Sequence, residues 1–197
     1  MKHPGLINRV HQTKNEVFNW SDDNFAKAQN IIKKYPNGRQ QSAVLPLLDL
    51  AQRQNKGWLS VKAIEKVAET LSMSYIRVLE VATFYSMFNL EPVGENFIQI
   101  CRTTPCWLRG SEKLTKIAKE VTGCNLGETS KDNKFTFVEV ECLGACCNAP
   151  MVQINDDYFE DLNEDNFKRL LINLKDDKEI SKGSQIGRLS SNPERKN

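Results

Sequence analysis

The chain has 197 residues and a formal net charge of +2 at pH 7. This length suits one domain or two small ones, and the near-neutral charge gives no bias towards nucleic acid. No stretch of about 18 apolar residues occurs, so no transmembrane helix is expected. The N-terminus, MKHPGLINRVHQTKNEV, lacks the apolar core of a secretory signal. The chain is therefore expected to be a cytoplasmic bacterial protein or a mature organellar one.

Residues 1–20 are predicted to be a loosely ordered N-terminal arm, in which His3 and His11 are solvated side chains without a catalytic role. Residues 21–94 are predicted to form a small helical bundle, because apolar residues recur there at helical spacing. The predicted helices begin, in chain order, at Ser21, after Ser42, at Ser60, and after Ser72 or Ser74. The apolar stripe of the first helix is Phe25, Ala28 and Ile32, and that of the fourth is Ile76, Leu79, Thr83 and Phe84.

Glu91 to Asn96 is predicted to be the linker to a second domain, residues 95–175, where strand patterns appear. The predicted strands are 97–101, 135–141, 151–154 and 158–162. A helix with Thr104 as N-cap and an apolar stripe from Leu114 to Val121 follows the first strand, and Asn163 opens a last helix. The order β-α-β-β-β-α predicts an α/β fold with a mixed four-stranded sheet. The polar segment 176–197 has no apolar stripe and is predicted to be a tail, disordered alone or laid over a partner.

Four of the six cysteines form two pairs, Cys101-x4-Cys106 and Cys142-x3-Cys146. Each pair follows a predicted strand, so a fold that brings the two strand ends together places four thiolates around one point. Six cysteines in a cytosolic protein indicate metal or redox chemistry and not structural disulfides. The remaining two, Cys124 and Cys147, are interpreted as free, unligated thiols.

Four thiolates suit either an iron–sulfur cluster or a structural zinc ion. Structural zinc sites usually contain C-x2-C knuckles, whereas the wider x4 and x3 spacings favour a binuclear cluster whose two irons spread the ligands. Cys106 falls in the first turn of the predicted helix, where free N–H groups favour a thiolate. Arg102, beside the site, is expected either to lower the cost of the cluster's negative charge or to be a solvated surface residue.

At these residues the chain closely resembles the thioredoxin-like [2Fe-2S] subunit of NADH:quinone oxidoreductase, respiratory complex I, a component known in bacteria as the E subunit. The resemblance spans about residues 20–175, and its C-x4-C…C-x3-C pattern is highly specific. The segment 187–193 is only loosely similar to the family. The matching runs are VATFYSMFNLEPVG, ICRTTPCWLRGSE, LGETS and VEVECLGACCNAPMVQINDDYFEDL.

The resemblance implies a thioredoxin-like fold for the second domain and one [2Fe-2S] cluster held by Cys101, Cys106, Cys142 and Cys146. It implies a one-electron carrier that docks on the flavoprotein subunit, which holds FMN and binds NADH, and that assembles with other subunits of the hydrophilic arm. The expected location is peripheral, on the cytoplasmic face of the bacterial inner membrane or the matrix side of a mitochondrion. The chain has no G-x-G-x-x-G or P-loop motif, so no nucleotide site and no complete active site of its own are expected.

Several alternatives remain. The same module could serve an NAD-linked hydrogenase or a formate dehydrogenase, or the four cysteines could hold a structural zinc ion. A DNA-reading helix-turn-helix over 61–84 is disfavoured, because its second helix is mostly apolar with a single arginine. A dithiol enzyme is disfavoured by the lack of C-x-x-C. As a separate hypothesis, the Ala149–Pro150 peptide bond is cis, as in many thioredoxin-like folds.

Overall fold

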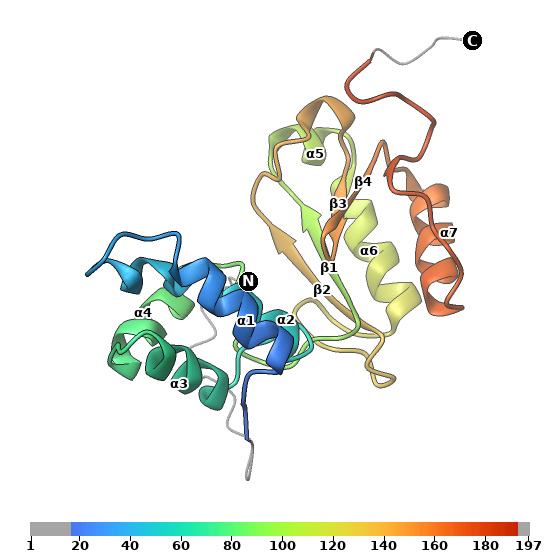
Figure 1. Ribbon diagram of the computed structural model, residues 1–197. Coiled ribbons are helices and arrows are strands. Elements are labelled where there is room, and N and C mark those ends of the chain that lie inside the picture. Colours follow the sequence, from blue (N-terminus) through green and yellow to red (C-terminus); the bar gives the residue numbers. More distant parts are fainter. Residues whose placement is uncertain (1–16, 193–197) are drawn as a thin grey trace. The chain divides into compact units, whose positions relative to one another are not determined.

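The computed structural model of the chain describes residues 17–192. The chain consists of two compact units that divide between Val93 and Gly94. The helical unit precedes this boundary and the sheet unit follows it (Figure 1). Most of the expected N-terminal arm, including His3 and His11, lies outside the described residues. No helix within residues 17–192 is long and apolar enough to cross a membrane.

The helical unit is a bundle around one apolar core. Its helices are α1 (Asp22–Ile32), the 3-10 turn η2 (Gln40–Ala43), α2 (Val44–Gln54), α3 (Val61–Thr70) and α4 (Tyr75–Phe84). The most deeply buried large side chains of this core are Leu47, Leu48, Leu59, Ile64, Val67 and Val78.

Local capping chemistry fixes two of the helix starts. The hydroxyl of Ser21 accepts a hydrogen bond from the Asn24 amide, and that of Ser60 accepts one from the Ala63 amide. Ser74 occupies the N-cap of α4 without a side-chain cap bond. The predicted start after Ser42 is preceded in the structure by η2, so Ala43 is the N-cap of α2.

The predicted apolar stripe of α4 is wrong for Ile76, Thr83 and Phe84, whereas Leu79 is half-buried against the core. Val78 and Ala82 are the buried residues of this helix, whereas Ile76 and Phe84 are 57% and 78% exposed. Because α4 carries apolar residues on more than one face, periodicity alone does not identify the face that packs. Phe25 of α1 is likewise 51% exposed, although it shares a helical stripe with the buried Ala28.

The sheet unit contains a five-stranded sheet in the order β2-β1-β3-β4-β5 (Figure 1). Its strands are β1 (Asn96–Cys101), β2 (Phe135–Val140), β3 (Val152–Ile154), β4 (Asp157–Glu160) and β5 (Gly183–Ser184). β1 runs parallel to β2 and antiparallel to β3, so the sheet is mixed, as predicted. The helices α6 (Ser111–Thr122) and α7 (Glu164–Lys175) pack side by side and enclose the core with the sheet.

Two expectations for this unit need correction. The predicted helix after β1 is two helices, a short α5 (Thr104–Leu108) and α6, separated by Gly110 with a positive φ of 95°. The N-cap of α5 is Thr103, and Thr104 is its first residue. A left-handed residue ends a helix, which explains why one continuous helix does not form.

The polar C-terminal segment contributes a fifth strand to the sheet. Residues 183–184 form β5, which pairs in parallel with β4 and adds a fifth strand to the four that were predicted. The prediction that this segment is disordered on its own is therefore wrong for residues 183–192, whereas its contact with a partner stays a prediction. A two-residue strand leaves no periodic signal, because strand patterns need about four residues or more.

Candidate metal centre

The topology of the sheet brings the two cysteine pairs together. Cys101 is the last residue of β1 and lies opposite Val140, the last residue of β2. Since β1 and β2 are parallel neighbours, their carboxyl ends meet at one edge, and the chain continues from there into Cys106 and Cys142. The 3-10 turn η3 (Cys146–Asn148) lies at the same end of the sheet as α5 (Figure 1). Arg109 links the two turns by donating from Nε to the Ala149 carbonyl at 3.3 Å.

The four thiols differ in exposure. Cys101 and Cys106 are 2% and 1% exposed and pack with Ala149 and Met151 in a small core of their own. Cys142 and Cys146 are exposed. The site therefore has a buried pair on the β1–α5 connection and a solvent-facing pair on the loop after β2.

Short contacts join the two cysteines of each pair, and further interactions link one pair to the other. The sulfurs of Cys142 and Cys146 are 3.5 Å apart, and Cys101 and Cys106 are linked by a side-chain hydrogen bond. Electrostatic repulsion from Cys146 contributes to the raised pKa of Cys106, so the two pairs interact across the site. Thr103 bonds to sulfurs of both pairs, at 3.5 Å from Cys101 Sγ and also to Cys142.

The buried pair is electrostatically asymmetric. Burial opposes ionisation of Cys101, but hydrogen bonds from Thr103 and from the Leu143 amide outweigh it, and the pKa of Cys101 lies below its ordinary value. Burial raises the pKa of Cys106 to about 12, and the hydrogen bond with Cys101 acts in the same direction. In the metal-free chain Cys106 is thus a neutral thiol. Binding of a metal cation to its sulfur would release the proton.

In the exposed pair, too, one cysteine has a lowered pKa and the other a raised pKa. The Gly144 amide donates to Cys142 Sγ at 3.4 Å and, with the thiol of Cys146, holds the pKa of Cys142 below normal. The hydrogen bond to Cys142 raises the pKa of Cys146. Gly144 has a positive φ of 87°, a conformation that turns its N–H towards the sulfur and that a glycine adopts without strain.

These donors fit a binuclear cluster. Two sulfurs on one tetrahedral ion at about 2.3 Å lie roughly 3.8 Å apart, close to the observed Cys142–Cys146 separation. Among residues 17–192, no three His, Cys, Asp or Glu side chains gather closely enough to hold a single ion. The thiols form two neighbouring pairs, a donor arrangement that suits the two irons of a [2Fe-2S] cluster.

The arginine next to the buried cysteine pair is held in an ion pair. Arg102, which follows Cys101, donates from Nη1 to Glu139 Oε2 at 2.7 Å, and the other oxygen of Glu139 accepts from Thr115. The Arg102 side chain is 36% exposed. Arg102 is therefore neither an isolated positive charge at the site nor a fully solvated residue.

The other two cysteines lie apart from this arrangement. Cys124 is 6% exposed, packs in the main core of the sheet unit, and has its sulfur 3.2 Å from Thr122 Oγ1. Cys147 is exposed, and its backbone carbonyl accepts a hydrogen bond from Arg188. Both are free thiols, as are the four paired cysteines.

Sequence reasoning missed two residues around the site, Thr103 and Arg188. Thr103 lies between Cys101 and Cys106, and its position in this short connection was the available signal. Arg188 is 41 residues from the carbonyl that it contacts, and no local pattern could indicate that. The cis hypothesis for Ala149–Pro150 is confirmed.

Comparison with known proteins identifies the family. The family model of thioredoxin-like [2Fe-2S] ferredoxins matches residues 28–175. The E subunit of NADH-quinone oxidoreductase from Rickettsia bellii is 57% identical over 165 residues, which cover 84% of this chain and 99% of that protein. The mitochondrial NADH dehydrogenase [ubiquinone] flavoprotein 2 of Dictyostelium discoideum is 51% identical over 171 residues, 87% of this chain and 69% of that one.

A solved structure shares the fold. The NAD+-reducing [NiFe]-hydrogenase in its H2-reduced state matches with a TM-score of 0.59 and 17% identity. The match covers 68% of this chain and 22% of the hydrogenase chain, so the present chain spans about a fifth of that protein. The family predicted from the cysteine motifs is thus confirmed, together with the α/β fold: the chain belongs to the thioredoxin-like [2Fe-2S] ferredoxins.

Proposed function

We propose that this chain is the electron-carrying [2Fe-2S] subunit of an NADH:quinone oxidoreductase, with one cluster bound by Cys101, Cys106, Cys142 and Cys146. The observation that carries the proposal is the meeting of two cysteine pairs at the carboxyl ends of the parallel strands β1 and β2. A relative that bears this subunit's name, at 57% identity over nearly its whole length, supports the host enzyme. When bound, the cluster supplies one-electron oxidation and reduction.

The residues of the chain define how such a cluster is held. Cys101 and Cys106 anchor its buried side, while Cys142 and Cys146 hold the side that faces solvent. The Gly144 amide and the Thr103 hydroxyl donate towards the sulfurs. Such donors stabilise negative charge on the sulfurs and so tune the reduction potential.

The exposed pair also indicates where electrons enter or leave. Solvent-facing ligands place one side of the cluster at the protein surface, within reach of a docked partner. We propose the flavoprotein subunit, which holds FMN and binds NADH, as that partner, within an assembly of hydrophilic-arm subunits. The proposed location is peripheral, on the cytoplasmic face of the bacterial inner membrane or its mitochondrial equivalent. The isolated chain is then an oxidoreductase subunit without NADH-oxidising activity of its own.

Metal analysis of the anaerobically purified full chain tests the proposal. Two irons and two acid-labile sulfides per chain, with an EPR signal that appears on reduction, are the expected result. Replacing Cys101 by serine should abolish the signal or change its shape. The matched variants Cys124→Ser and Cys147→Ser should retain the full iron content. One zinc per chain without sulfide would overturn the redox function and leave a structural metal site.

A further inference from the structure

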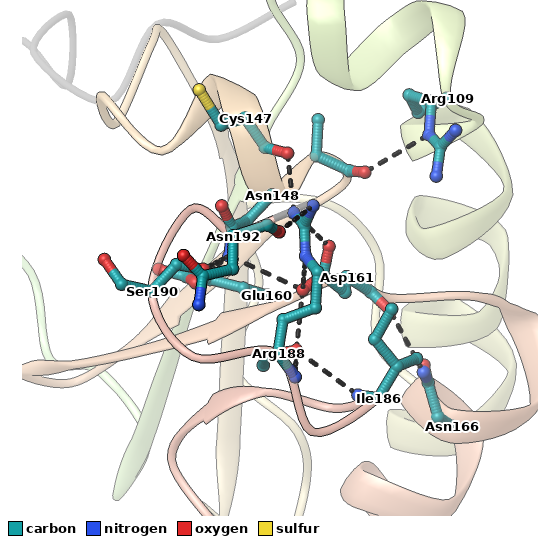
Figure 2. Close-up of polar contacts among 12 residues, drawn as sticks. Arg109, Cys147, Asn148, Glu160, Asp161, Asn166, Ile186, Arg188, Ser190 and Asn192 are labelled. Atoms are coloured by element: carbon teal, nitrogen blue, oxygen red, sulfur yellow. Dashed lines mark hydrogen bonds and ion pairs between the residues drawn. The ribbon is translucent and has the colours of Figure 1, made fainter. Parts of the chain in front are cut away.

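The C-terminal segment 183–192 returns to the end of the sheet unit that carries the cysteines. After β5, the chain places Arg188 against the loop that contains Cys146 and Cys147 (Figure 2). The guanidinium donates from Nη2 to the Cys147 carbonyl at 2.6 Å. This contact joins the C-terminal segment to Cys147, the neighbour of the proposed cluster ligand Cys146.

Arg188 is itself held in a fixed orientation. Its Nε donates to Asp161 Oδ2 at 3.1 Å, and its Nη2 makes an ion-pair contact with Asp161 Oδ1 at 2.8 Å. The side chains are 11% and 2% exposed, so solvent screens the pair little. Ser184 donates to Asp161 Oδ2 at 2.6 Å and accepts from the Arg188 amide at 3.0 Å. The third nitrogen, Nη1, donates to the Asn192 carbonyl.

A second set of bonds fastens the other side of the same loop. Asn148, 4% exposed, donates from Nδ2 to Glu160 Oε2 and to the Ser190 carbonyl, both at 2.8 Å. The Asn148 carbonyl accepts from the Asp161 amide at 2.8 Å. The loop segment 146–148 is therefore held on two sides by residues that are distant in sequence (Figure 2).

We propose that Arg188 is a positioning residue for the cysteine loop, acting as a buried clamp between Asp161 and the Cys147 carbonyl and so fixing the backbone from which Cys146 projects. This inference rests on the proposed function, because it concerns the placement of a proposed cluster ligand. Cys146 and Cys142 lie on a loop with little burial of their own. A ligand on such a loop gains a defined position only from contacts beyond the loop, and outer contacts of this kind affect metal affinity about 10–100-fold.

The guanidinium geometry makes a sharp test possible. Lysine keeps the positive charge but has one nitrogen, so it cannot span both oxygens of Asp161 and the Cys147 carbonyl together. The variant Arg188→Lys therefore removes the multiple contacts of the guanidinium while it keeps the positive charge. Arg169→Lys is the matched control, since Arg169 is an exposed residue of α7 in the same unit.

The first measurement is the rate at which the cluster-loaded full chain loses iron to a chelator. It is made at a temperature where far-UV circular dichroism shows all variants folded. Arg188→Lys should release iron about tenfold faster than the wild type, and Arg169→Lys should match the wild type. Equal release rates for Arg188→Lys and the wild type would overturn the proposal.

The second measurement uses the metal-free chain and so separates the two proposals. Amide hydrogen exchange over residues 144–149 should be faster in Arg188→Lys than in wild type and in Arg169→Lys, with unchanged exchange in β1 and β2. If the wild-type chain binds no iron, the proposed function fails while this measurement still decides on the clamp. Unchanged exchange over 144–149 would overturn the clamp even in a chain that binds a full cluster.

Discussion

The hydroxyl oxygen of Thr103 lies 3.5 Å from the sulfur of Cys101 and also hydrogen-bonds to Cys142, a member of the other cysteine pair. Thr103 is the N-cap of α5 but makes no side-chain cap bond there. Its hydroxyl is thus directed at sulfur and not at the helix. A donor that reaches both pairs is well placed to stabilise the reduced form of a bound cluster, which carries one more negative charge.

Replacing Thr103 by valine should lower the reduction potential of the cluster. A hydrogen bond to a charged group contributes about 1.5 kcal/mol, and about 59 mV corresponds to a tenfold change for one electron, so a fall of roughly 60 mV is expected. An EPR-monitored redox titration measures it. Thr103→Ser retains the hydroxyl and should stay close to the wild-type potential. A valine variant with the wild-type potential would exclude this hydrogen bond as a tuning contact.

The two exposed cysteines should differ in reactivity in the metal-free chain. The Gly144 amide lowers the pKa of Cys142, whereas the hydrogen bond that Cys146 donates to Cys142 raises the pKa of Cys146. Because the thiolate is the reactive form, iodoacetamide at about pH 8 should label Cys142 before Cys146, although both side chains are exposed. The difference should shrink as the pH rises and both thiols ionise. Mass spectrometry of time points gives the order, and preferential labelling of Cys146 would contradict it.

The buried thiol of Cys106 should make the stability of the metal-free chain depend on pH. Burial raises the pKa of Cys106 to about 12. A folded-state pKa above the ordinary value of 9.0 stabilises the fold fully below pH 9, and this contribution is lost as the pH rises towards 12. The metal-free wild type should therefore lose stability between about pH 9 and pH 11 more steeply than Cys106→Ala, which lacks the titrating group. Urea unfolding at a series of pH values checks this, and parallel curves for the two proteins would refute it.

Two serines at helix N-caps form a matched pair for the helical unit. Ser60 is fully buried and its hydroxyl accepts from the Ala63 amide at 3.2 Å. Ser60→Ala should lower the free energy of unfolding by about 1 kcal/mol or more, because a buried amide loses its partner. Ser74 makes no cap bond, so Ser74→Ala should cost less than about 0.5 kcal/mol. Urea denaturation followed by circular dichroism compares them, and equal costs would show that the Ser60 bond contributes nothing.

The backbone of Phe135 passes so close to position 94 that only glycine fits there. A Cβ at this position would lie 2.6 Å from the carbonyl carbon of Phe135 in β2, and backbone atoms cannot move aside easily. Gly94→Ala should therefore destabilise the sheet unit by about 3 kcal/mol. Gly127→Ala meets no atom within 4 Å and should cost only the strain of its left-handed backbone, about 1 kcal/mol. Thermal unfolding of the two variants distinguishes the clash from the strain, and a smaller cost for Gly94→Ala would contradict the packing.

Regular elements were predictable because their signals are local. The alternation in Phe135–Val140 predicts a strand, and Ser21 and Ser60 each precede a helical stripe, as the structure confirms. Predictions failed where packing decides between equivalent local choices. In α4 both Val78 and Ile76 suit a core, and only the neighbouring helices determine that Val78 is buried.

The sequence by itself determined the family, the cluster type expected for it and the order of the strands β1 to β4, because cysteine spacing and side-chain periodicity are encoded within short stretches. Only the tertiary structure decided that Thr103 contacts both cysteine pairs, that residues 183–184 add a strand, and that Arg188 holds the Cys147 carbonyl. The last of these contacts joins residues 41 positions apart. Its energy comes from buried pairing that exists once the chain has folded, so no local pattern records it.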